Sequence, residues 1–397
     1  MSPAARHPSS PGRGISRRLA LAAPAAALTG WALTGCASDA GESPGQSADT
    51  PNGTPAGTPA DTSRVRWRMP DEGERHTRTW MAYGASRAIW GADLLPTVRT
   101  NLVDVANTIA EFEPVTMLVR PGELAELRRA VSATVTLQAQ DVDDLWIRDT
   151  GPTFVADDAG LAGVDFNFNG WGGKQEHTRD ATVAAAVCRD AGVPRVTTDL
   201  VLEGGALEVD GRGTAIITRS CVLNDNRNPG WTAGEVEAEL GRLVGIRKVI
   251  WLPGIAGKDI TDGHTDFYAR FTAPGHVVAA LDPDPASFDH DVTATHLDIL
   301  HAATDADGNP LTVTTLTAPS VLRATDPGGD FAAGYVNFYV CNGGVVAPQF
   351  GDREADAAAY SALAAAFPDR EVVQVDIDGI AAGGGGIHCA TQQQPAG

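Results

Sequence analysis

The amino-acid sequence predicts an α/β fold, because segments with helical periodicity alternate along the chain with short apolar runs that suit buried strands. Residues 97–111 have helical spacing and place Leu102, Val105 and Ile109 on one face. Residues 115–119 then form a continuous apolar run, which is typical of a buried strand. Repeated strand–helix–strand units of this kind predict a sheet architecture with helical crossovers.

The remaining predicted elements continue this alternation in chain order. Helices are predicted over 122–133, 181–191, 233–243 and 355–367. Strands are predicted over 135–137, 144–148, 249–252 and 372–380. No linker composition follows residue 63 and no repeat is visible at the level of residues, so residues 64–397 are predicted to form one domain.

The composition narrows the class of protein. The chain has 397 residues, of which 43% are hydrophobic and 20% charged, as in a globular protein with a sizeable core. A formal net charge of −20 argues against nucleic-acid binding and is compatible with a cationic substrate. Five cysteines without CxxC or zinc-site spacing argue against a disulfide framework and a sequence-encoded metal site.

The first residues have the pattern of an export signal. The arginine pair Arg17–Arg18 precedes an uncharged stretch over 19–35, which ends in Leu-Thr-Gly before Cys36. Residues 1–36 are therefore predicted to be a twin-arginine lipoprotein signal peptide with lipid attached to Cys36. Ordinary cleavage nearby, with Cys36 incidental, is the alternative. The apolar stretch is short for a membrane span.

Residues 37–63 are rich in Gly, Ser, Thr, Pro and Asp and lack aromatic residues, so they cannot bury enough surface to fold. They are predicted to be a disordered tether. Together, signal and tether predict an exported protein that is lipid-anchored on the outer face of the bacterial cytoplasmic membrane. No other membrane contact is expected.

The most informative feature lies near the C-terminus. Four glycines at 383–386 bring the backbone close to another group, and Cys389 follows, with amide side chains at 392–394. This pattern predicts a loop that presents one thiol to a pocket beside polar amides. A flexible tail with a free cysteine is the alternative.

Three other clusters carry candidate site residues. If 264–267 were a strand, His264 and Asp266 would point to the same face; a metal ligand or a satisfied buried histidine are the alternatives for His264. Asp149 follows a predicted strand and could instead form a surface ion pair with Arg148. The Glu-Gly-Gly sequence that begins at Glu203 is weak evidence when taken alone.

A thiol, a histidine and several carboxylates together indicate covalent catalysis on a cationic electrophile. Carboxylates repel anions and bind a planar guanidinium through paired hydrogen bonds. The cysteine follows the histidine in the chain, which is the reverse of the order in papain-like proteases.

These motifs resemble the agmatine deiminase family, which includes bacterial peptidylarginine deiminases. The resemblance spans about 69–395 and is carried by five motifs in order, at 146–152, 169–174, 203–205, 263–266 and 386–393. It implies the pentein fold, a pseudo-symmetric α/β propeller of five modules. It also implies that the protein is a hydrolase that converts a guanidine into a urea and ammonia.

The resemblance implies roles for particular residues. Cys389 would attack the guanidinium carbon, while Asp149 and Asp266 would hold its nitrogens. His264, oriented by Glu203, would protonate the departing ammonia and then activate water. The family residues that match on the substrate's side are Trp146, Trp171 and Asn337. No cofactor and no metal are implied, the partner is a small cationic guanidine, and an oligomer is compatible with the resemblance.

The substrate is expected to be agmatine, which would yield N-carbamoylputrescine for polyamine synthesis. The segment 69–76 is expected to help close over the far end of the substrate, and its acids Asp71, Glu72 and Glu74 favour an amine. Arg75 and Arg78 would instead meet a carboxylate, so peptidylarginine or free arginine is the alternative. An amidinotransferase and a non-catalytic binding lipoprotein are further alternatives.

Overall fold

The computed structural model of the protein describes residues 67–324, 328 and 330–397. The predicted signal peptide with Cys36, the predicted tether over 37–63 and the predicted domain start at residue 64 lie outside the described residues. In the part of the chain that is described, no helix combines the length and the apolar character needed to cross a bilayer.

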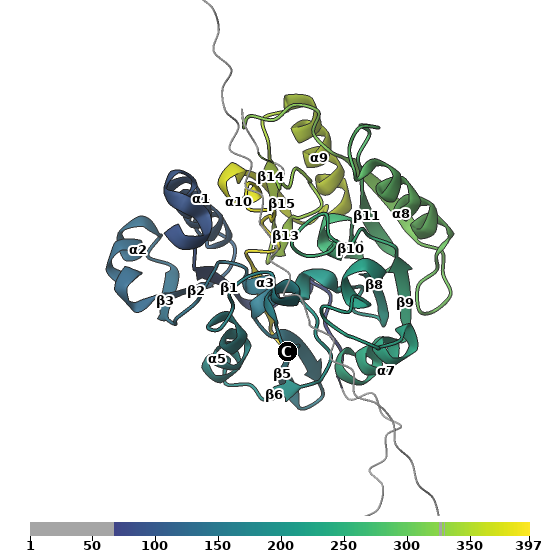
Figure 1. Ribbon diagram of the computed structural model, residues 1–397, viewed down its shortest axis with the longest axis horizontal. Helices are drawn as coiled ribbons and strands as arrows, with labels where there is room; N and C mark the ends of the chain where they lie inside the picture. Colours follow the sequence, from purple (N-terminus) through teal and green to yellow (C-terminus); the bar gives the residue numbers. More distant parts are fainter. Residues whose placement is uncertain (1–66, 325–327, 329) are drawn as a thin grey trace, which may run out of the picture. The chain divides into compact units, whose positions relative to one another are not determined.

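Five small sheets follow one another in chain order around a common centre (Figure 1). The first sheet has the strand order β16 (Gln392–Pro395), β1 (His76–Tyr83), β2 (Val115–Val119) and β3 (Val135–Ala139). The others are β4 (Thr153–Asp157), β5 (Gly160–Asp165) and β6 (Arg195–Thr197); β7 (Glu208–Val209), β8 (Thr214–Thr218) and β9 (Lys248–Leu252); β10 (Ala269–Ala273), β11 (His276–Leu281) and β12 (Thr312–Thr317); and β13 (Tyr339–Cys341), β14 (Gly344–Gln349) and β15 (Glu371–Asp376). The sequence analysis expected this five-module α/β arrangement.

Each module combines an antiparallel pair with a parallel pair, as in β4–β5 followed by β5–β6. Parallel neighbours need a crossover, and a helix provides it in every module. These crossover helices are α1 (Arg87–Ile109), α5 (Val183–Ala191), α7 (Ala233–Val244), α8 (His290–Ala302) and α9 (Arg353–Ala366). The short helices are α2 (Leu124–Ala130), α3 (Ile147–Thr150), α4 (Gly170–Gly173), α6 (Arg219–Val222) and α10 (Asp378–Ala381).

The crossover helices bury one face against the sheets. In α1 the side chains of Val98, Leu102, Val105 and Ile109 are fully buried, and their spacing of three to four residues places them on one stripe. Helix α7 begins at a capping box, in which the Thr232 hydroxyl accepts from the backbone N–H of Glu235 and the Glu235 carboxylate accepts from that of Thr232.

The last strand of the chain completes the first module. β16 pairs antiparallel with β1, with Trp80 opposite Gln392, and so occupies the place that β4 has beside β5. Residue 389 comes three residues before this strand. Closure of the ring of modules by the C-terminus therefore fixes the position of the candidate nucleophile.

Several predicted elements differ from the structure. The strand predicted over 144–148 is wrong: Asp144 lies in a turn, where its carboxylate accepts hydrogen bonds from Leu145 N and from two indoles, and α3 begins at Ile147. The strand predicted over 372–380 ends at Asp376, because α10 follows. The helix predicted from residue 97 begins at Arg87 and contains Pro96.

Candidate active site

The loop that carries Cys389 lies against three side chains that leave no room for a Cβ atom. A Cβ on Gly383 would approach Trp90 to 2.1 Å, and one on Gly385 would approach Trp146 to 2.1 Å. At Gly386 it would lie 2.4 Å from Oδ1 of Asn337. The glycine run therefore serves close backbone packing, as expected from the sequence.

Cys389 follows this loop and is 4% exposed. Its Sγ lies 3.3 Å from Nδ2 of Asn337 and 3.4 Å from Oδ2 of Asp266, while its N–H donates to Oδ1 of Asn337. Burial, together with the negative charges of Asp266 and Asp149, raises the pKa of the Cys389 thiol well above its ordinary value. Without an added cation the thiol is therefore neutral at pH 7.

Gly205 lies at the point where three candidate residues meet. A Cβ here would lie 2.6 Å from Nδ1 of His264 and 3.0 Å from a carboxylate oxygen of both Asp149 and Asp266. Only glycine fits this position, which explains the Glu-Gly-Gly sequence. His264 and Asp266 do share one site, but the predicted strand is wrong, because residues 265–267 form a 3-10 turn.

Asp149 is held by two donors. Nε1 of Trp171 donates to its Oδ2 at 3.0 Å, and Gly205 N donates to its Oδ1 at 3.0 Å. Burial, partly offset by His264, raises the pKa of Asp149 to about 6. The alternative of a surface Arg148–Asp149 pair is wrong, because both residues are at least 94% buried and Arg148 binds Glu72 at 3.1 Å.

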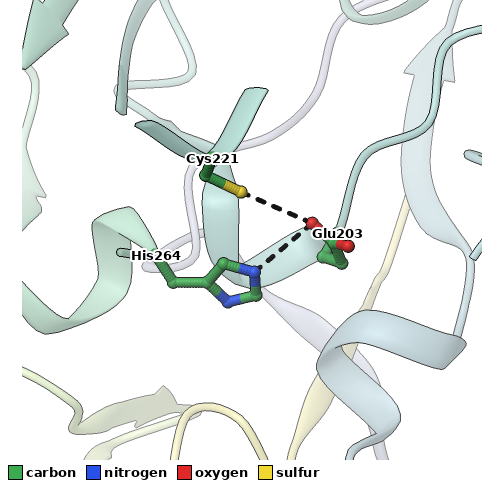
Figure 2. A group of neighbouring side chains, drawn as sticks. All are labelled: Glu203, Cys221 and His264. Carbon is green, nitrogen blue, oxygen red and sulfur yellow. Dashed lines mark hydrogen bonds and ion pairs between the residues drawn. The ribbon is translucent and has the colours of Figure 1, made fainter. Parts of the chain in front are cut away.

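His264 is surrounded by groups that stabilise its protonated form. Its Nε2 lies 3.4 Å from Oε2 of Glu203, its Nδ1 lies 3.9 Å from Oδ1 of Asp149, and Cys221 lies beside it (Figure 2). Burial opposes the imidazolium, but Asp149 and hydrogen bonds with Cys221 and Glu203 outweigh burial and raise the pKa of His264 well above its ordinary value.

Glu203 is fixed by an arginine that the sequence analysis did not single out. Nε of Arg227 lies 2.9 and 3.0 Å from the two carboxylate oxygens of Glu203, and both side chains are fully buried. Arg227 also donates to Asp262 and to the carbonyl of Thr261, just before His264. One cation thus positions both the histidine's segment and its carboxylate partner.

The two tryptophans predicted to lie on the substrate's side of the site have different positions in the structure. Trp171 touches Asp149 directly, from a left-handed backbone conformation with φ of 55° that closes the turn at α4. Trp146 instead packs on the glycine loop at Gly385 and donates its indole N–H to Asp144. Asn337 lies beside Cys389, as the motif predicted.

A buried charge network lies behind the site, and the sequence analysis missed it. His388 joins Oδ2 of Asp266 at 2.8 Å to Oε2 of Glu72 at 2.9 Å. Glu72 also pairs with Arg270 at 2.9 Å and with Arg148 at 3.1 Å. The position of His388 directly before the candidate nucleophile was a sequence signal that could have identified it. Nothing in the sequence indicated that Glu72 would be its partner.

This network changes the interpretation of one residue of the segment 69–76. Glu72 is buried in ion pairs with Arg270 and Arg148, so the expectation that its carboxylate favours a substrate amine is wrong. Glu74 forms a surface pair with Arg68, and Asp71 accepts from the backbone N–H of Gly73. For these two carboxylates the preference for an amine stays a prediction.

Two polar atoms in the site, Nδ1 of His264 and Oδ1 of Asp266, are buried and have no hydrogen-bond partner among the described residues. Such groups are costly unless a ligand engages them. With Asp149 nearby, they form a pocket of negative potential beside a thiol. The arrangement suits a planar cation whose carbon lies near Sγ of Cys389 and whose nitrogens face carboxylates.

Comparisons with known proteins agree with this geometry. Residues 68–395 match the sequence model of the Porphyromonas-type peptidyl-arginine deiminase family. A Streptomyces coelicolor protein is 45% identical over 342 residues, which cover 83% of this chain and 99% of that protein. The agmatine deiminase of Pseudomonas aeruginosa strain LESB58 is 39% identical over 354 residues, covering 83% and 96%.

Among solved structures, the agmatine deiminase of Enterococcus faecalis superposes with a TM-score of 0.78 at 32% identity, covering 83% of this chain and 96% of that one. The expected pentein fold is confirmed, as is the expected enzyme class, a C–N hydrolase of the agmatine deiminase type that acts on guanidino groups. The chain belongs to the Porphyromonas-type peptidyl-arginine deiminase family.

Proposed function

We propose that the protein hydrolyses agmatine to N-carbamoylputrescine and ammonia through a covalent intermediate on Cys389. The observation that carries this proposal is a pair of buried atoms next to the thiol, Nδ1 of His264 and Oδ1 of Asp266, which have no hydrogen-bond partner within the described part of the chain. The names of the relatives from Pseudomonas and Enterococcus support the choice of agmatine.

The first half-reaction follows from the electrostatics of the site. A bound guanidinium places a positive charge between Asp149 and Asp266, and this cation lowers the pKa of a thiol that both carboxylates otherwise raise. The thiol proton passes to solvent, and the thiolate attacks the guanidinium carbon. His264, which is protonated in the free site, donates its Nδ1 proton to the departing nitrogen, so ammonia leaves and a thiouronium cation remains.

The second half-reaction uses the neutral His264 that results. Its Nδ1 accepts a proton from water and the oxygen adds to the thiouronium carbon. The carbon–sulfur bond then breaks, the sulfur takes up the remaining hydroxyl proton, and the ureido product and the thiol are released. Glu203 supports the imidazolium at Nε2 in each cycle, with its own position set by Arg227. An amidinotransferase would deliver the amidino group to an amine and release no ammonia.

The enclosure of the site favours a small substrate over a peptide. Cys389, Asp149, His264 and Asp266 are between 1% and 6% exposed, and Glu203 is fully buried. We expect kcat/KM for agmatine to exceed that for a blocked arginine peptide by at least about tenfold, since peptide backbone on both sides must enter the same space. Ureido product and ammonia are measured for both, and for free arginine. A ratio that favours the peptide would overturn the substrate and leave the chemistry intact.

The activity should fall on the acid side as Asp149 takes up a proton. With a pKa of about 6 in the free enzyme, this carboxylate is ionised above pH 6 and neutral below it. Because the guanidinium needs the ionised form, kcat/KM should fall through about pH 6 and approach about a tenfold loss per unit further down. The acid-side fall of kcat should occur at a lower pH than the fall of kcat/KM, since the bound cation stabilises the ionised carboxylate. A flat kcat/KM between pH 7 and pH 5 would contradict this role of Asp149.

We also propose that the protein is exported and lipid-anchored, on the strength of Arg17–Arg18 and Cys36 in the sequence. Arg17→Lys together with Arg18→Lys should retain the protein in the cytoplasm, because twin-arginine export requires the pair. Cys36→Ala should release it from the membrane fraction. Fractionation and lipid labelling test both outcomes, and labelling that survives Cys36→Ala would refute the lipoprotein.

A further inference from the structure

A carboxylate, a thiol and an imidazole, which are three kinds of metal ligand, lie close together in the interior of the protein. Glu203 precedes the turn Gly204–Ala206, Cys221 lies on α6 and His264 precedes the turn Thr265–Phe267 (Figure 2). Their ligand atoms lie within 4.8 Å of one another, and all three residues are at least 99% buried. We propose that this triangle binds one Zn²⁺ ion, or a cation of similar preference, and that the bound ion inhibits the enzyme.

The distances match those of a tetrahedral metal site, and the N–O distance is also long for a charge-assisted hydrogen bond. Zinc bonds of about 2.0–2.2 Å to N and O and about 2.3 Å to S, at tetrahedral angles, separate N from O by about 3.4 Å and S from O by about 3.6 Å. Nε2 of His264 lies 3.4 Å from Oε2 of Glu203, and Sγ of Cys221 lies 3.6 Å from the same oxygen. A charge-assisted N–H···O bond would be about 2.7–2.9 Å long.

Two of the three ligands would be anionic. A thiolate at Cys221 and the carboxylate at Glu203 would supply two negative charges to a divalent cation. Arg227, which touches Glu203, also pairs with Asp262 at 2.7 Å, an aspartate that it shares with Lys174 at 2.7 Å. The contacts of Arg227 with both oxygens of Glu203 fix the orientation of the Glu203 carboxylate, as outer-shell partners do for metal ligands. One thiolate, one imidazole and one carboxylate favour Zn²⁺ over Mg²⁺ or Ca²⁺.

Inhibition follows from which atoms the ion would take. It would bind Nε2 of His264 and Oε2 of Glu203, two atoms that face each other at 3.4 Å. The ion would therefore replace the contact by which Glu203 orients and supports the imidazole ring in the proposed reaction. Metal binding stands independently of the proposed function, whereas the inhibition rests on it.

The first test measures binding without turnover, in the full chain carrying Cys389→Ala. Titration with Co²⁺ should give a thiolate-to-cobalt charge-transfer band, and Zn²⁺ should bleach it. Adding Cys221→Ala should abolish the band, while adding Cys188→Ala, another buried thiol, should leave it. Far-UV circular dichroism checks the fold, with Cys221→Ser as the second variant. A band that is absent with Cys389→Ala alone, or that survives loss of Cys221, would overturn the site.

The second test measures inhibition in chains that keep Cys389. Zn²⁺ should inhibit the parent enzyme reversibly, with activity restored by a chelator. Each protein is compared with its own activity without zinc, and Cys221→Ala should raise the inhibitory Zn²⁺ concentration at least about tenfold, because one ligand has been removed. An unchanged inhibitory concentration would refute the inhibitory site. Absence of turnover on every guanidine tested would instead count against the proposed function and leave the cobalt result to judge the site.

Discussion

Replacing Cys389 with alanine should abolish turnover, with a loss of at least about 10⁴-fold, because the proposed covalent intermediate forms on its sulfur. The removed atom is Sγ, which lies 3.4 Å from Asp266 and 3.3 Å from Asn337. The backbone contacts of residue 389 remain, since its N–H donates to Asn337 and its C=O accepts from Arg148 N. The fold should therefore persist, and ureido product is the readout.

Cys188→Ala is the matched control for this variant. Cys188 is also buried, on α5, and lies outside the site. It should keep near-parental activity, with melting temperatures checked for both proteins. A Cys389→Ala protein that retains a substantial fraction of activity would refute the nucleophile.

Asp149→Asn and Asp266→Asn should each lower kcat/KM by about 100-fold or more, which corresponds to about 2.7 kcal/mol of lost transition-state stabilisation. The substitution keeps the shape and removes the charge that faces the guanidinium. At position 266 an asparagine still offers an acceptor to His388, whose Nδ1 lies 2.8 Å from Oδ2. The orientation of the loop should therefore survive while the charge is lost.

Asp165→Asn provides the control for loss of a buried carboxylate elsewhere. Asp165 is 4% exposed and pairs with Arg195 at 2.8 Å in the second module. Its activity should stay within a few-fold of the parent. If the activity of either site variant matched the activity of this control, the corresponding aspartate would not be a residue of the active site. If both did, the guanidinium pocket itself would be wrong.

Local sequence signals were sufficient where one chain segment decides its own conformation. The apolar run at 115–119 coincides with β2, and α7 begins at Ala233 as predicted. The glycine run at 383–386 announced close packing because glycine is needed wherever a Cβ would collide. The strand predicted over 144–148 failed because this run bends around the Asp144 carboxylate, which accepts from Gln175. The strand alternation assumed for His264 and Asp266 failed because residues 265–267 form a 3-10 turn.

The five-module repetition was not visible as a repeat of residues. Each module keeps only a pattern of pairing, two antiparallel strands followed by a helical crossover to a parallel one, and many residues satisfy such a pattern. The fold class was available from the alternation of elements; the number of modules came from the family resemblance. That the last strand β16 completes the first module is a contact between opposite ends of the domain.

The sequence by itself determined the α/β class, the reactive residue types and, through its motifs, the family of the enzyme. The tertiary structure alone decided which distant groups surround them: Glu72 behind His388, Arg227 behind Glu203, and Cys221 beside His264. The physical reason is that a charged side chain carries no local mark of its partner. Its solvation is settled only when folding buries it, and burial then demands a counter-charge from wherever the chain brings one.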